Sequence, residues 1–288
     1  MRLVSYLGGA GGERLGALAG DVVVPLTDLR ADAPATMDQL LVTGPSALQG
    51  LAQLLEGATG EELSGVRLLP PVPRPRNIVC VGRNYRDHAA EEGVEAPKEP
   101  ALFLKHTASL AGPGDDIVWD PAYATQVDFE AELAVVIGRE ARHVSAGEAL
   151  DFVLGYTCCN DVSARDLQFG DVQWTRGKSL ATFCPLGPEL VTPDEVPDPQ
   201  ALAIRCLVNG RVMQEASTAD MFHSVADVIS YASRAFALLP GDVIATGTPG
   251  GVGIFRDPPE LLSDGDEVVV EVQSVGRLVN RCRTVGAG

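Results

Sequence analysis

The sequence lacks the features that mark several large classes of protein. No apolar run reaches the roughly 18 residues that a membrane-spanning helix needs, and residues 1–7 alternate like a short strand instead of forming the apolar part of a secretion signal. Basic residues are scarce, because 22 Lys and Arg stand against 39 Asp and Glu, a formal charge of -17. A chain so acidic, with no basic cluster, repels nucleic acid and anionic membranes. We therefore expect a cytoplasmic protein with neither as a partner.

Cysteine is also sparse and shows no metal-binding or redox pattern. None of the six cysteines belongs to a C-x-x-C pair, and most lie inside apolar, strand-like runs. Cys158 and Cys159 are adjacent, so on a strand they point to opposite faces and could not bind one metal ion together. We expect six buried, reduced thiols and no structural zinc site.

Proline divides the chain into two regions. Residues 70–75, PPVPRP, form a stiff extended segment, because proline fixes its own dihedral angle and restricts the residue before it. Short strands and helix-like segments precede it, which predicts a small N-terminal α/β domain over residues 1–70. Beyond it, residues 71–288 carry many β-branched runs and few helices, which predicts a strand-dominated α+β body. The expected strands are 78–81, 133–137, 203–208, 242–246 and 267–272, and the expected helices are 85–92, 145–152 and 225–239.

Three carboxylates alternate at the start of a buried-strand pattern. Asp128, Glu130 and Glu132 lead into the apolar residues 133–137, and side chains two residues apart share one face of a strand. Such a cluster repels itself unless a positive charge lies nearby. A divalent cation would supply it, and a solvated acidic face on an edge strand is the alternative. Asp161, after another apolar run, is either a turn residue or a third oxygen ligand for Mg²⁺ or Mn²⁺.

A short predicted helix carries a possible acid–base pair. His88 and Glu91 are three residues apart, so their side chains can touch on a helix. A carboxylate that binds one imidazole nitrogen raises the basicity of the other, which suits a general base. Glu92 is also within reach, so spacing leaves the partner open, and a surface His/Glu pair is the alternative.

Two further motifs have both a functional and a purely structural interpretation. Lys178 lies in a polar break among apolar residues and could stabilise an enolate, or it could be an ordinary surface lysine. The glycine-rich segment 247–253 lacks the G-K-[ST] ending of a nucleotide-binding loop. Its N–H groups and the hydroxyl of Thr248 could bind a carboxylate, and a plain tight loop is the alternative.

As an ordered set, these motifs resemble the fumarylacetoacetate hydrolase superfamily from about residue 76 to residue 283. The segment before residue 70 resembles the small N-terminal domain of many bacterial members. The matching stretches are VGRNYRDHAAE (81–91), FLK (103–105), DFEAELAVVI (128–137), NDVSARDLQ (160–168), GKS (177–179) and TGTP (246–249).

The resemblance implies a β-rich α+β catalytic domain preceded by a small N-terminal α/β domain. It implies one Mg²⁺ or Mn²⁺ ion bound by Glu130, Glu132 and Asp161, and it removes Asp128 from the ligands. It also implies a catalytic His88–Glu91 pair, with Lys178 near the metal. The substrate-binding residues expected from the motifs are Arg83, Tyr85, Lys105, Gln168 and Thr248.

Family members act on 2-oxo acids through an enolate that the metal and the lysine stabilise. Our leading hypothesis is a hydrolase that cleaves a C–C bond in acylpyruvate-type 2,4-dioxo acids such as fumarylpyruvate or acetylpyruvate, with oxaloacetate decarboxylation as a further activity. The alternative is an isomerase or tautomerase of unsaturated 2-hydroxy dioic acids of the 2-hydroxyhepta-2,4-diene-1,7-dioate type. A homodimer is expected by analogy with the family.

Overall fold

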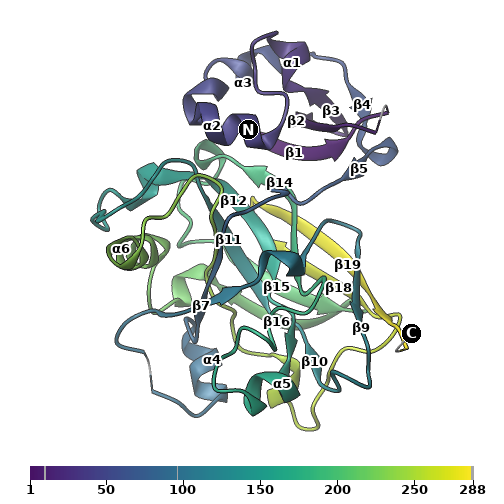
Figure 1. Ribbon diagram of the computed structural model, residues 1–288, viewed down its shortest axis with the longest axis vertical. Helices are drawn as coiled ribbons and strands as arrows, with labels where there is room; N and C mark the ends of the chain where they lie inside the picture. Colours follow the sequence, from purple (N-terminus) through teal and green to yellow (C-terminus); the bar gives the residue numbers. More distant parts are fainter. Residues whose placement is uncertain (10, 96, 287–288) are drawn as a thin grey trace.

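One large sheet runs through most of the molecule. The computed structural model describes residues 1–9, 11–95 and 97–286. Figure 1 shows the N-terminal strands at one end and helices near the opposite end. The twelve-stranded sheet follows the path β4 (Glu61–Glu62), β3 (Val22–Pro25), β2 (Glu13–Ala19), β1 (Arg2–Leu7), β14 (Cys184–Val191), β12 (Val153–Asn160), β11 (Ala131–Ile137), β17 (Val243–Ala245), β6 (Ile78–Gly82), β7 (Ala101–Lys105), with β5 (Arg67–Leu68) beside β1 and β8 (Leu110–Ala111) beside β14.

A second sheet packs against the centre of the first. Its order is β16 (Arg211–Ser217), β15 (Ala203–Val208), β18 (Glu267–Val272), β19 (Gly276–Thr284), β9 (Asp116–Trp119), and a short ladder pairs β10 (Val127–Asp128) with β13 (Ser163–Ala164). Leu133 and Val135 on β11 share one apolar core with Val268 and Val270 on β18. All seven residues of β11 and all eight of β12 are buried. Because apolar clusters cover both faces of these two strands, any charge on them needs a partner inside the protein.

The helices are short and lie at the margins of the sheets. The α-helices are α1 (Leu26–Leu29), α2 (Met37–Thr43), α3 (Leu51–Leu54), α4 (Arg86–Glu91), α5 (Arg165–Gly170) and α6 (Val225–Ala235). The helix α6 begins with a capping box, in which Ser224 accepts the N–H of Asp227 and Asp227 accepts that of Ser224. It ends earlier than predicted, because Leu238 already pairs with Ala141 in an isolated bridge. The helix predicted over residues 145–152 is reduced to the 3-10 turn Ala149–Phe152.

The N-terminal region is joined to the body by main-chain hydrogen bonds. Strand β1 pairs with β14, with Arg2 opposite Val191 and Leu3 opposite Leu190. The predicted division near residue 70 therefore falls between two parts of one continuous sheet. The strand-dominated α+β fold with a small N-terminal lobe is confirmed.

Candidate active site

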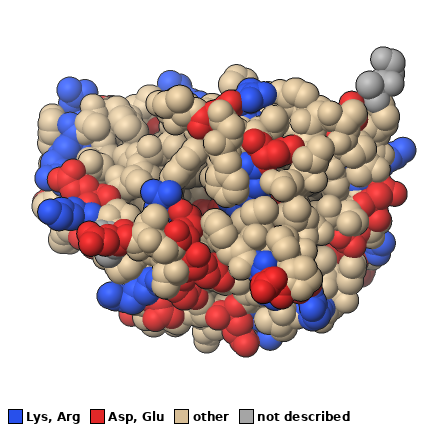
Figure 2. All heavy atoms as spheres, turned by 90° about the horizontal axis from the view of Figure 1, so that it is seen from below, with Lys and Arg blue, Asp and Glu red and all other residues tan. Residues whose placement is uncertain are grey.

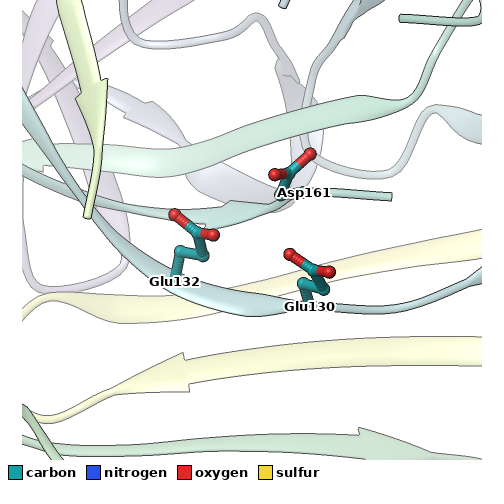
Figure 3. Close-up of side chains that lie close together, drawn as sticks. All are labelled: Glu130, Glu132 and Asp161. Atoms are coloured by element: carbon teal, nitrogen blue, oxygen red, sulfur yellow. The ribbon is translucent and has the colours of Figure 1, made fainter. Parts of the chain in front are cut away.

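Two neighbouring strands bring the three predicted metal ligands together. Glu132 lies on β11 opposite Cys159 of β12. Glu130 directly precedes β11, Asp161 directly follows β12, and the Asp161 N–H donates to the Glu130 carbonyl at 2.9 Å. Figure 3 shows Glu130 and Glu132 rising from one segment and Asp161 approaching from its neighbour, with the three carboxylates facing a common space. Antiparallel pairing thus brings together residues that are about 30 positions apart.

The donor set fits a hard divalent cation. One oxygen from each of Glu130, Glu132 and Asp161 lies within 4.8 Å of the others, and all three side chains are buried. Oxygen-only ligands of this kind suit Mg²⁺ or Mn²⁺, and three such ligands leave coordination positions for a substrate. The alternative of a solvated acidic edge is wrong, because β11 is an interior strand covered on both faces.

Three basic side chains surround the carboxylates. The Lys178 Nζ lies 2.8 Å from Glu130 and 2.9 Å from Asp161, and the Lys105 Nζ lies 2.6 Å from the other Asp161 oxygen. Arg165 approaches Glu130 at 2.7 Å through Nη1. Lys178 is therefore not an ordinary surface lysine: its buried ammonium group bridges two of the three candidate ligands.

The pKa values of Glu130 and Glu132 shift in opposite directions, because the two carboxylates have different neighbours. Burial alone would raise the pKa of Glu130, but Lys178 and Arg165 lower it to about 2. Burial raises the pKa of Glu132 well above its usual range, and the charges of Asp161 and Glu130 act in the same direction. A Gly247 N–H donates to Glu132 at 2.8 Å and partly opposes this rise. The glycine-rich loop does bind a carboxylate, but that carboxylate belongs to the protein.

Asp128 shares Arg165 with Glu130 but otherwise faces the main chain at Gly253. It accepts hydrogen bonds from the N–H groups of Gly253 and Ile254 and from the Arg165 Nε at 2.9 Å. This arrangement fixes the guanidinium beside Glu130. Asp128 thus holds Arg165 in place beside Glu130.

His88 lies between two carboxylates. Its Nδ1 is 3.5 Å from Glu91 and its Nε2 is 3.2 Å from Glu92, so the structure brings both possible partners to the ring. Burial lowers the pKa of His88, but the adjacent carboxylates of Glu91 and Glu92 outweigh it and raise the pKa to about 9. Glu92 also pairs with Arg83 at 2.7 Å. The imidazole therefore carries a proton at neutral pH when no cation is bound nearby.

The predicted substrate-binding residues divide into two groups. Arg83, Gln168 and Thr248 line a pocket that also contains His88 and Lys178. The other two are fully buried: Lys105 donates to Asp161 and to the carbonyls of Val162 and Lys178, and Tyr85 is an interior residue. The contacts of Lys105 are those of a residue that positions Asp161.

Arg165 and Trp174 are among the residues of this pocket that were not predicted. Arg165 belongs to a recognised motif, but no sequence feature distinguished it from the other arginines. Its Nη2 is buried and has no hydrogen-bond partner among the described residues, although the group lines the pocket. Trp174 also lines the pocket, and nothing in the sequence around it signals a role.

Other predictions concern the rest of the chain. All six cysteines are free and buried, as expected. Over the ranges that the structure describes, no helix is long and apolar enough to cross a membrane.

The end of the molecule that carries α4 and α5 is shown in Figure 2. Acidic side chains gather there beside a hollow in the surface.

Known proteins share both the sequence and the fold. Residues 77–283 match the family described as fumarylacetoacetate (FAA) hydrolase C-terminal. The human protein named "Oxaloacetate tautomerase FAHD2A, mitochondrial" (Homo sapiens) is 44% identical over 265 residues, which cover 91% of this chain and 84% of the relative.

Solved structures of enzymes align over the full length. The 5-carboxymethyl-2-hydroxymuconate delta-isomerase from Mycobacterium smegmatis is 36% identical, with a TM-score of 0.80 and 100% of each chain covered. The maleylpyruvate hydrolase from Sphingobium sp. SYK-6, in complex with manganese (II) ion and pyruvate, is 32% identical with the same TM-score and coverage. Family match, identity and fold agree, so this chain belongs to the fumarylacetoacetate hydrolase family.

Proposed function

We propose that the protein is a divalent-metal-dependent tautomerase of short 2-oxo dicarboxylic acids, with oxaloacetate as its first candidate substrate. The observation that carries this proposal is the 44% identity to the human oxaloacetate tautomerase across 91% of the chain. Tautomerisation moves a proton between C3 and the 2-oxygen, breaks no C–C bond and consumes no water. The site needs a means to stabilise the enolate and a group that transfers a proton.

Glu130, Glu132 and Asp161 are the residues that would bind Mg²⁺ or Mn²⁺. The bound cation would act as a Lewis acid on the 2-oxo group and so acidify the hydrogens on C3. Lys178 and Arg165 add positive charge beside the same carboxylates. In a site closed to water, such fixed charges stabilise a developing enolate more strongly than solvent would.

His88 is the proposed proton carrier. Its ring lines the pocket, and the flanking Glu91 and Glu92 favour the protonated form. The enol releases its 2-hydroxyl proton to solvent, and an imidazolium suits donation of a proton to C3 of the resulting enolate. In the reverse direction the neutral ring takes that proton from C3, and the enolate oxygen takes a proton from solvent. Gln168 and Arg83 line the same pocket and are proposed to orient the substrate carboxylates.

The test follows the decay of the oxaloacetate enol in the presence of the purified protein and Mn²⁺. Protein-free Mn²⁺ and protein with excess EDTA are the controls, because free metal also acts on oxaloacetate. We expect protein-dependent conversion that EDTA abolishes and that Glu132→Ala and His88→Gln each reduce by about 100-fold or more. Equal rates with and without the protein would rule out the proposal.

C–C bond hydrolysis is the second candidate. It was the leading hypothesis from the sequence, and the 32% identity and full-length alignment with maleylpyruvate hydrolase support it. In that reaction the neutral His88 would deprotonate a water molecule. Release of pyruvate from acetylpyruvate or fumarylpyruvate, at rates above those for enol conversion, would favour this candidate. Conversion of a 2-hydroxy dienoic dioic acid without cleavage would favour the isomerase.

A further inference from the structure

We propose that Trp174 sets the maximum length of the substrate, so that the site favours the shortest 2-oxo dicarboxylic acids over longer ones. This inference rests on the proposed function, because it concerns the substrate class of the same pocket. Trp174 lies between α5 and Lys178, on a turn whose Lys178 N–H donates to the Trp174 carbonyl at 3.0 Å. The residue is therefore tied by the main chain to the lysine that bridges Glu130 and Asp161.

Three contacts fix the indole across the pocket. The ring meets Phe103 edge-on at a centroid distance of 5.3 Å, and the Arg83 guanidinium lies 5.4 Å from its centre. It also packs directly on Gly82, where a Cβ atom would come within 2.5 Å of the indole Cζ3. A half-buried tryptophan held on three sides is a rigid wall.

The space that this wall encloses is small. The pocket lined by Trp174, His88 and Lys178 has a volume of only about 20 Å³, so a bound substrate must lie in direct contact with its walls. A larger hollow of about 660 Å³ is lined by residues adjacent to Trp174 in sequence, such as Val172 and Thr175, but not by Trp174 itself. The indole thus belongs to the inner pocket, whereas its neighbours face the outer hollow.

A length limit follows from this geometry. The 2-oxo acid end of the substrate must reach the carboxylate cluster, so the distal carboxylate must lie farther from that cluster, on the side of Arg83 and Trp174. Arg83 lines the pocket with a partly exposed side chain, and among the described residues only its Nε has a hydrogen-bond partner. Each added methylene group would push the distal end into the indole. Overpacking against a rigid wall is costly, and one methylene in a tight pocket changes discrimination by about tenfold or more.

The experiment measures binding separately from turnover. The Mn²⁺-loaded protein is titrated with oxaloacetate, 2-oxoglutarate, 2-oxoadipate and 2-oxopimelate by calorimetry, and thermal unfolding confirms that each variant is folded. For the wild type we expect affinity to fall along the series. For Trp174→Ala we expect the ratio of 2-oxoadipate affinity to oxaloacetate affinity to rise about tenfold or more. Trp174→Phe keeps an aromatic ring on Gly82 and should give an intermediate affinity ratio. This variant replaces Trp174→Ala in the test if the alanine variant does not fold.

Val172→Ala is the matched control, because Val172 lies on the same segment but is 98% exposed. Its length profile should equal that of the wild type. An unchanged ratio in both Trp174 variants would overturn the inference, even if oxaloacetate is tautomerised. If the wild type binds these acids but does not convert oxaloacetate, the proposed reaction is wrong. The ratios of binding affinities still test the length limit in that case.

Discussion

At the scale of single residues, the site is defined by how its buried charges are paired. Glu130, Asp161 and Lys178 form one group, and His88 with Glu91 and Glu92 forms another. A buried ion pair contributes little net stability, but the loss of one member is costly, because the remaining charge is left without a partner or water.

Replacing Lys178 should make stability depend on the divalent cation. In Lys178→Met, Glu130 and Asp161 lose their shared ammonium, and we expect a loss of about 3 kcal/mol in the free energy of unfolding in EDTA. Mn²⁺ should recover much of it, because it supplies the missing positive charge. Denaturant unfolding with Mn²⁺ and with EDTA measures both effects. Lys98→Met changes an exposed lysine and should show neither. An equal response of wild type and Lys178→Met to Mn²⁺ would contradict this prediction.

The protonated form of His88 should stabilise the fold over a defined pH range. Its pKa is raised to about 9 in the folded protein, against about 6.5 when unfolded. A raised pKa gives stability that is fully present below the unfolded value and is lost as pH rises through about 9. In EDTA, we expect the stability advantage of wild type over His88→Gln to be about 2 to 3 kcal/mol larger at low pH than above pH ~9. Denaturant titrations across this range should show no such trend for the control His143→Asn, which alters an exposed histidine.

At the scale of elements, the turn that carries Trp174 and Lys178 is held against α5 by a glycine. A Cβ atom on Gly177 would lie 2.6 Å from the Gln168 N and 3.0 Å from the Ala164 carbonyl oxygen, both of them main-chain atoms. Main chain cannot rotate away as a side chain can. The turn and the helix therefore approach each other as closely as they do only because residue 177 has no side chain.

Gly177→Ala should consequently disturb the site through packing alone. We expect a loss of about 1 to 3 kcal/mol in stability and a marked fall in catalytic rate, because Lys178 moves with the turn. The matched control is Gly170→Ala at the end of α5, where an added Cβ meets nothing within 4 Å. That variant should be neutral or slightly more stable. If both variants unfold at the same denaturant concentration, the packing argument fails.

The sequence alone predicts elements whose hydrophobic pattern is local. It does not predict features that depend on contacts between residues far apart in the chain. Periodicity found residues 203–208 and 267–272 as strands, and β15 and β18 match them. Alternation on β11 pointed to Glu130 and Glu132, but only pairing with β12 brings Asp161 to them. Glu92 and Glu91 could not be separated by spacing, because both contact His88. Trp174 was missed because its place in the pocket depends on contacts with Gly82 and Phe103, which are far away in sequence.

At the scale of the whole molecule, the two lobes share a sheet and an apolar core. Leu3, Leu15 and Met37 from the N-terminal lobe lie in one buried cluster with Val136 and Leu190 from the body. Removal of such a lobe would expose both the apolar face and the hydrogen-bonding edge of β14. The molecule should therefore unfold as one unit, although the chain has a proline-rich segment between its parts.

Cooperative unfolding can be tested with a single core substitution in the lobe. Leu3→Ala removes a fully buried side chain and should destabilise the protein by about 2 to 5 kcal/mol. Both tryptophans, Trp119 and Trp174, lie in the body. Their fluorescence should shift to the same lower midpoint as the far-ultraviolet circular dichroism. A fluorescence midpoint that stays at the wild-type value would mean that the lobe unfolds independently.

The pairing of β11 with β12 has a consequence for how the protein reaches its native state. Glu132 and Asp161 face the same space only when Glu132 lies opposite Cys159. A slip of one residue would turn one strand over and move its carboxylate to the opposite face of the sheet. A cation that binds only the native arrangement favours the correctly aligned hairpin over misaligned ones by mass action. A cation bound by Glu130, Glu132 and Asp161 would thus stabilise the correct strand alignment even before any substrate is present.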